Sequence, residues 1–205
     1  MTAGWGFSCF IDDGEQKVLF DTGDNGPALL GNLKKLDILP EKIDKIVISH
    51  EHHDHFGGLF DLLSINNRAT VFVPFSFSDK FKIKIRQKTK LVEVTSPQEI
   101  SQNIYSTGLI ENNPDEQSLI LKTIRGIGVV VGCSHPGVGR ILKIAKKYGN
   151  IYGIVGGFHE FSNYNLLEGI EVIGACHCTQ HIKEINENFP EQFEEIKAGD
   201  SLEWD

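Results

Sequence analysis

The sequence has no long apolar segment and little that is typical of secreted proteins. No stretch approaches the roughly 18 apolar residues that a membrane-spanning helix needs, and the first residues lack the basic flank and apolar core of a signal peptide. Of only four cysteines, Cys133, Cys176 and Cys178 lie close to histidines, so no evenly spaced disulfide framework is visible. These absences predict a cytoplasmic protein that does not bind membranes.

An excess of positive charge is also missing. Lys plus Arg number 20 against 28 Asp plus Glu, which gives a net charge of −8. Such a chain repels a phosphate backbone on average, so nucleic acid is not expected as a partner. No internal repeat or linker is evident, and 205 residues are enough for one sizeable core. The sequence predicts a single domain, 1–205, and leaves the oligomeric state open.

Short apolar runs alternate with amphipathic helical patterns. Eight runs have the length and composition of strands: Phe7–Ile11, Lys17–Phe20, Lys45–Ile48, Thr70–Val73, Gln117–Lys122, Ile127–Val131, Asn150–Val155 and Ile170–Ile173. Apolar residues at helical spacing predict helices over Ala28–Leu36 and Val138–Tyr148, and a weaker one over Gln180–Asn188. Strands mixed with helices favour a layered α/β architecture.

The segment Phe75–Ser106 has no clear helical or strand pattern as a whole. Within residues 80–90, lysines and one arginine alternate partly with Phe81, Ile83 and Ile85, as on a half-exposed strand. We expect a solvated edge strand that its lysines protect from aggregation. A basic wall beside a substrate is the alternative.

Histidines follow four of the predicted strands within two to four residues. They are His50, His135, His159 and His177, and a fifth strand ends at Asp21. Residues just beyond strand ends lie in loops along the edge of a sheet, where a rigid scaffold holds them. Ligands that are distant in sequence can therefore converge in space, which predicts a metal site.

The segment from His50 to His55 sharpens this prediction. In an extended chain, residues two apart project to the same side, so His50 and His52 can bind one metal together. A turn into a helix at Gly57–Leu59 would direct Asp54 and His55 to an adjacent second metal. Imidazoles with a carboxylate suit one or two divalent ions, zinc foremost, with iron or manganese as alternatives. His53 and a later histidine, His181, are expected at the surface.

These motifs resemble those of the metallo-β-lactamase superfamily. The segment from His50 to His55 matches its H-x-H-x-D-H signature, VLFDTG with Asp21 is similar to its first motif, and His135 and His177 match later ligand histidines. The segments DEQSLILKT, GCSHPG, GGFHE and ACHCTQ resemble the dihydropterin–ribofuranosylaminobenzene phosphate synthase-like branch. The resemblance implies a four-layer αββα sandwich with metals at one edge of two sheets.

The chain departs from the family pattern in three places. His159 stands where the superfamily usually places a bridging aspartate, so the resemblance implies His159 as a substitute ligand. The sequence opens almost directly on Gly4–Phe7, where relatives commonly carry an earlier strand, so an N-terminal strand is expected to be missing. Residues 75–106 are also short for this branch, which implies a reduced pocket wall.

The chemistry expected of such a cluster is metal-assisted. A divalent metal activates water at neutral pH and polarises the bond under attack. Asp54 would bind a metal and orient the nucleophile. Asp21 would fix the tautomer of a ligand histidine, or would only form a turn in Asp-Thr-Gly. Arg140, in the first turn of a predicted helix, is a weak candidate for binding a substrate anion. Cys176 and Cys178 should point away from His177 and pack near the site, with a soft-metal or redox role as the alternative.

We consider four classes of function for this sequence, two of which are disfavoured. The first is a metal-dependent enzyme acting on a small, phosphorylated substrate, either as a hydrolase or as a pterin-type synthase that forms a C–N bond with release of diphosphate. A di-iron redox protein is disfavoured, because that branch characteristically has Glu where this chain has His52. A nuclease is disfavoured by the acidic charge. A non-catalytic metal-binding protein stays open.

Overall fold

The computed structural model describes residues 1–204. The chain divides after Thr95 into two compact units, each with its own sheet. We call residues 1–95 unit 1 and the remainder unit 2. Within residues 1–204, no helix has the length and apolar character required to cross a membrane. The prediction of a single domain remains a prediction.

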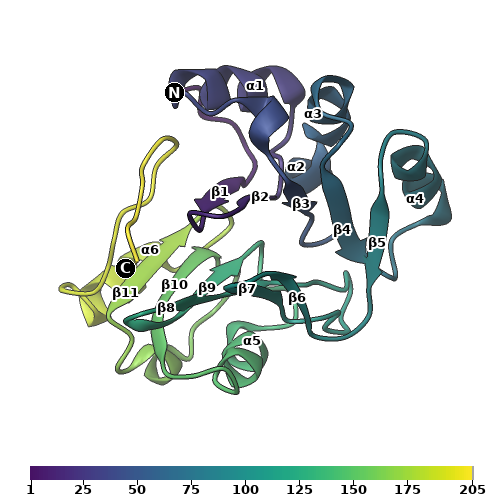
Figure 1. Cartoon of the computed structure of the whole chain (residues 1–205). Helices are drawn as coiled ribbons and strands as arrows, with labels where there is room; N and C mark the ends of the chain where they lie inside the picture. The colour runs from purple at the N-terminus through teal and green to yellow at the C-terminus, as the bar shows by residue number, and fades with distance from the viewer. Residues whose placement is uncertain (205) are drawn as a thin grey trace. The chain divides into compact units, whose positions relative to one another are not determined.

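Unit 1 contains a five-stranded sheet with helices beside it (Figure 1). Its strands lie in chain order: β1 (Cys9–Asp12), β2 (Lys17–Phe20), β3 (Lys45–Val47), β4 (Thr70–Pro74) and β5 (Leu91–Val94). The first pair is antiparallel and the others are parallel. Its helical segments are α1 (Gly26–Lys35), η1 (Pro40–Lys42), α2 (His53–Phe56), α3 (Leu59–Ile65) and α4 (Asp79–Arg86).

One face of this sheet forms the core of unit 1. Because side chains alternate along a strand, Ile46 and Ile48 project to the same side, and both are fully buried. Apolar residues of the helices, among them Leu33, Leu62 and Ile85, join the same cluster. The predicted helix at residues 28–36 is thus confirmed as α1, and its apolar stripe is the buried face. The carboxyl ends of the parallel strands lead into loops.

Unit 2 contains a six-stranded mixed sheet. Its order is β11 (Val172–Cys176), β10 (Ile151–Gly157), β9 (Gly126–Val131), β8 (Leu119–Thr123), β7 (Ile104–Ser106) and β6 (Gln98–Ser101). Strands β9, β10 and β11 are parallel, and the other pairs are antiparallel. The helical segments are α5 (Val138–Ala145), η2 (Tyr164–Leu167) and α6 (Ile182–Asn188). The three parallel strands end in the segments that carry the predicted histidines.

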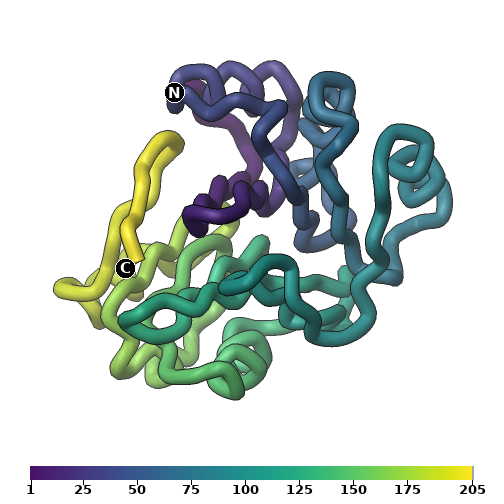
Figure 2. Tube along the Cα trace, viewed as in Figure 1, coloured from purple at the N-terminus to yellow at the C-terminus, as the bar shows by residue number. Residues whose placement is uncertain are grey.

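The apolar stripe of α5 covers the sheet of unit 2. Ile141 and Leu142 are buried in a cluster with Val129 and Ile154. After α6, the chain turns back so that its end lies beside this sheet (Figure 2). A Cβ atom on Gly128 would lie 2.3 Å from the Trp204 ring, so that glycine provides the space into which the indole packs.

The predicted strands are all present, with bounds that differ by up to three residues. The prediction of an edge strand within residues 80–90 is wrong, because residues 79–86 form helix α4. Phe81 and Ile85 are buried one helical turn apart, whereas Ile83, the middle residue of the apparent alternation, is 53% exposed. Lysine has a high helix propensity. Over a few residues the strand alternation and the helical spacing overlap, and the burial of Phe81 and Ile85 decided in favour of the helix.

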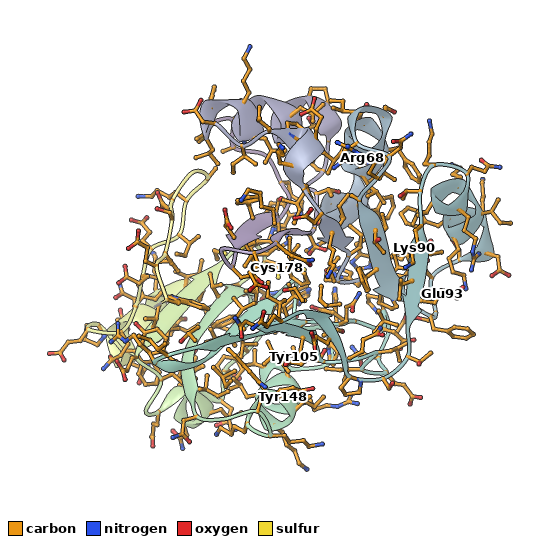
Figure 3. The ribbon with its side chains drawn as sticks, in the orientation of Figure 1. Arg68, Lys90, Glu93, Tyr105, Tyr148 and Cys178 are labelled. Carbon is orange, nitrogen blue, oxygen red and sulfur yellow. The ribbon has the colours of Figure 1, made fainter. Side chains whose placement is uncertain are left out.

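An ion-pair network connects helix α4 to strand β5. Glu93, labelled in Figure 3, accepts hydrogen bonds from the Lys82 ammonium at 3.0 Å and from Arg86. Desolvation of Lys82 disfavours its charge, but the hydrogen bonds from this ammonium to Glu93 and Asp79 outweigh that effect and raise its pKa. Lys82 is therefore a buried cation with its partners in place, and part of the basic segment faces inward.

The assignment of residues 79–86 to a helix leads to a prediction that a strand would not give. Ile85→Ala should destabilise the protein by about 2–5 kcal/mol, because it removes a fully buried side chain from the core. Ile83→Ala, two residues away, should change the free energy of unfolding by less than about 0.5 kcal/mol. Urea unfolding of both variants measures the difference. Equal losses would mean that both side chains share a buried face, as in a strand.

Candidate metal centre

A buried carboxylate at the end of β2 organises the histidines of unit 1. Asp21 is fully buried, and its Oδ1 accepts the Ser49 backbone N–H at 2.7 Å. Its Oδ2 accepts the Ser49 hydroxyl at 2.7 Å and lies 2.6 Å from His55 Nδ1. Since a carboxylate only accepts, His55 Nδ1 carries the proton, and the lone pair of the ring is on Nε2.

Ser49 extends this network to His50. The serine hydroxyl donates to Asp21, so it accepts from His50 Nδ1 at 2.9 Å. The lone pair of His50 therefore also lies on Nε2. This atom faces His52 Nδ1 across 3.0 Å. The arrangement presents two imidazole nitrogens at one point, as the extended spacing of the two residues predicts.

The next turn carries Asp54 and His55. After an extended His52, the backbone enters α2, and His55 Nε2 lies 3.7 Å from Asp54 Oδ2. A Cβ atom on Gly57 would lie 2.1 Å from the Asp24 carbonyl oxygen. A glycine at position 57 is thus required for the loop after β2 to contact this turn.

Glu51 holds the same loop from its other side. Its carboxylate accepts the backbone N–H of Ser78 at 2.6 Å and the hydroxyl of that serine. Ser78 is the N-cap residue of α4. This role of Glu51 could not be predicted from the sequence, because Glu51 and Ser78 are 27 residues apart.

In unit 2, a second buried carboxylate fixes the loop after β9. Glu116 Oε1 accepts the N–H groups of Cys133 and Ser134 at 3.0 and 2.9 Å, and its Oε2 accepts that of His135 at 2.8 Å. Sequence reasoning missed this residue. The available signal was an acidic residue at the entrance of an otherwise apolar strand in DEQSLILKT.

The histidines after β9 and β10 lie side by side. The ring centroids of His135 and His159 are 4.8 Å apart. The Ser134 hydroxyl donates to the Gly157 carbonyl at 2.8 Å, which ties the two loops together. The structure thus brings the predicted third-motif histidine and the proposed substitute for the bridging aspartate into one cluster.

The loop after β11 differs from the prediction. Cys178 was expected to point away from His177, but its Sγ forms one group with a ring nitrogen of His177 and Cys133 Sγ, all within 4.8 Å of one another. The expectation assumed an extended chain. His177 instead has a φ of 51°, and this left-handed conformation breaks the alternation of side chains.

Left-handed backbone recurs at the strand ends of both units. Asp21, Ser134, His159 and His177 all have φ between 51° and 58°. Such a conformation costs non-glycine residues free energy and persists only where the surroundings enforce it, as is typical of functional sites. At each position it turns the chain sharply out of the sheet, so that the loop residues can cluster.

The remaining candidates lie at the surface or have other contacts. The Arg140 guanidinium donates to the Glu111 carbonyl at 2.9 Å. His53 is exposed beside Phe56, and His181 precedes α6 with its ring 3.4 Å from Glu184. Burial raises the pKa of the Cys9 thiol to about 12, and the nearby Asp21 carboxylate adds to this effect. Cys9 is therefore a thiol rather than a thiolate.

The donors in unit 1 fit a divalent cation of the zinc type. Two imidazole nitrogens on a tetrahedral zinc lie about 3.3 Å apart, and the His50 and His52 nitrogens lie 3.0 Å apart. Hydrogen bonds to the opposite ring nitrogens fix the tautomer, which is the usual support of metal-binding imidazoles.

Comparisons with known proteins agree with the fold. The model of the metallo-β-lactamase superfamily matches residues 2–74. The chain is 29% identical to the 7,8-dihydropterin-6-methyl-4-(β-D-ribofuranosyl)-aminobenzene-5′-phosphate synthase of Methanocaldococcus jannaschii, over 90% of this chain and 83% of that protein. A crystal structure of a metal-dependent hydrolase of the β-lactamase superfamily superposes with a TM-score of 0.77 and 26% identity, over 98% of this chain and 92% of that one.

A diphosphatase of the PhnP family also has the same fold. It superposes with a TM-score of 0.67, covering 97% of this chain and 84% of that one, and at 15% identity the likeness extends to the fold alone. These findings confirm the predicted α/β metallo-β-lactamase fold.

The hydrogen bond of Asp21 predicts how metal affinity depends on this residue. Asp21→Asn should weaken binding of zinc about 10–100-fold, since the amide no longer enforces the tautomer of His55. Asp37→Asn is the matched control, because Asp37 has a similar φ of 56° but is exposed. Zinc titration against a competing chelator measures both, with thermal melts of the metal-free variants to check folding. Equal affinities of the two variants would remove Asp21 from the site.

Proposed function

We propose, from the premise that this chain is a member of the metallo-β-lactamase superfamily, that it is a metal-dependent enzyme acting on a small, phosphorylated substrate. The observation that carries the proposal is the buried Asp21–Ser49 network, which sets the tautomers of His50 and His55. Fixed imidazole lone pairs are a requirement of metal binding, and this network provides them.

The family resemblance assigns the ligands to two ions. His50, His52 and His135 would hold one ion, and Asp54, His55 and His177 the other, with His159 in place of the usual bridging aspartate. Support comes separately from each unit, since His50 with His52, and His135 with His159, are neighbours. Zinc suits imidazole and carboxylate donors best, with iron or manganese as alternatives.

The residues of unit 1 have distinct roles in the proposed reaction. When bound, a divalent metal supplies Lewis-acid activation of the nucleophile and of the bond under attack. Asp54, adjacent to His55 Nε2, would accept a hydrogen bond from the nucleophile and orient it toward the substrate. Asp21 does not contact the substrate in this scheme. It is a positioning residue that keeps the His55 proton on Nδ1 throughout.

Two reactions are compatible with this site. Similarity to the M. jannaschii synthase favours a pterin-type reaction, in which an arylamine nitrogen forms a bond to carbon and diphosphate departs. Similarity to the metal-dependent hydrolase favours hydrolysis, which on the proposed phosphorylated substrate would be attack by water on a phosphate ester. In either case the substrate would carry negative charge, and Arg140 is the candidate to bind it.

A non-catalytic metal-binding protein is the second candidate. Its support is the same orientation of His50 and His55, which binding alone also requires. A di-iron redox protein is less favoured because His52 occupies the position where that branch has Glu. For the metal-dependent enzyme we also propose a cytoplasmic location and no nucleic-acid partner.

Metal content tests the ligand assignment. His52→Ala should lose at least one equivalent of bound zinc, because His52 Nδ1 faces the same point as His50 Nε2. His53→Ala, an exposed neighbour, should retain the full content. Elemental analysis after dialysis gives the ratio of metal to protein, and circular dichroism checks that both variants fold. Full zinc content in folded His52→Ala would refute the assignment.

An activity screen tests the substrate class. The zinc-loaded protein should turn over a phosphorylated compound in a panel of phosphodiesters, pterin diphosphates with arylamines, lactones and thioesters. On the best phosphorylated substrate, Arg140→Ala should raise KM about 10–100-fold through loss of a charge-assisted hydrogen bond, with little change in kcat. Arg125→Ala, another exposed arginine, is the control. Turnover of lactones or thioesters alone would contradict the phosphate assignment.

A further inference from the structure

The loops of unit 2 bring two cysteines and a histidine to one place. Cys133 follows β9, and His177 and Cys178 follow β11. One ring nitrogen of His177 and both Sγ atoms lie within 4.8 Å of one another. Figure 3 labels Cys178 among these loops. The superfamily ligand motifs name only histidines and aspartates, whereas both thiols lie in the segments GCSHPG and ACHCTQ that resemble the synthase-like branch.

These separations suit a thiolate-binding cation. Two thiolates on a tetrahedral zinc lie about 3.8 Å apart, and a thiolate and an imidazole nitrogen lie slightly closer. A set of this size can therefore close around an ion by small side-chain rotations. Two cysteines and one histidine also leave a fourth position for water or substrate, which is the arrangement of zinc sites that perform chemistry.

The backbone holds this group together. Glu116 accepts the N–H of Cys133, which fixes one thiol-bearing loop, and the left-handed His177 turns its own ring and the Cys178 side chain to the same side. Gly157 provides the space between the loops, since a Cβ atom there would lie 2.6 Å from Cys178 Sγ. Cys133 is buried, and the other two residues are half-buried. The site is thus enclosed rather than a chance cluster on the surface.

We propose that Cys133, His177 and Cys178 bind a thiophilic divalent cation such as zinc, with both cysteines as thiolates. Because this set also uses His177, it is an alternative to the second ligand set of the proposed metal centre, so the inference rests on the proposed function for the role of the ion in the reaction but not for its ligands. The preference of the site shifts from manganese toward zinc, because thiolates favour softer cations.

Cobalt substitution of the full-length protein tests this inference. Co²⁺ bound by thiolates gives an intense near-ultraviolet charge-transfer band, whereas Co²⁺ bound only by imidazole and carboxylate does not. The wild-type protein should show this band. Cys133→Ser and Cys178→Ser should each weaken it strongly and lower the affinity of the site about tenfold or more. Cys9→Ser and Cys176→Ser are the matched controls and should keep the band.

Two further experiments distinguish this inference from the proposed function. His52→Ala should lose imidazole-bound cobalt but keep the thiolate band, because all three sulfur-site ligands lie in unit 2. Alkylation of the wild-type protein with iodoacetamide, followed by mass spectrometry, needs no variant. Zinc should protect Cys133 and Cys178 from modification by at least tenfold relative to the metal-free protein.

Absence of the band in metal-loaded wild-type protein would overturn the sulfur site while leaving the histidine centre intact. Persistence of the band in the folded Cys133→Ser and Cys178→Ser variants, or loss of the band in His52→Ala, would overturn it as well. Conversely, a retained band with no turnover of any phosphorylated compound would uphold the sulfur site and refute the proposed function.

Discussion

The burial of the Asp21 carboxylate is the constraint on which the histidine loop of unit 1 depends. A buried charge is costly unless hydrogen bonds satisfy it. Here Ser49 supplies two of them and His55 a third, so the loop after β3 must stay close to the end of β2. The same bonds set the protonated nitrogen of His55. Stability of the fold and readiness for metal binding thus come from one interaction.

In unit 2, the carboxylate of Glu116 holds a loop that carries candidate ligands. Glu116 accepts successive backbone N–H groups from Cys133 to His135, in a loop that leaves the sheet. Asp21 orients its histidine through the side chain, whereas Glu116 positions its loop through the backbone. Removing either carboxylate would leave buried donors unpaired, so both residues link folding to the site.

Strained backbone at the strand ends gives the site its shape. The left-handed residues Asp21, Ser134, His159 and His177 follow β2, β9, β10 and β11 respectively. In a continued strand, neighbouring side chains would diverge to opposite faces. The sharp turn at His177 instead directs its ring and Cys178 to one side. The chemistry proposed for the sulfur donors of unit 2 depends on this conformation, for which the hydrogen bonds of the loops supply the free energy.

The sequence by itself determined the α/β class, the strands that precede Asp21, His50, His135, His159 and His177, and the resemblance of these motifs to those of a known family. It could do so because strand periodicity and metal-ligand spacing are local properties. The tertiary structure alone decided that residues 79–86 form a helix, that Glu116 fixes a ligand loop, and that Cys178 joins His177. In each case the deciding factor was burial or a left-handed φ, which depends on neighbours that are remote in the chain.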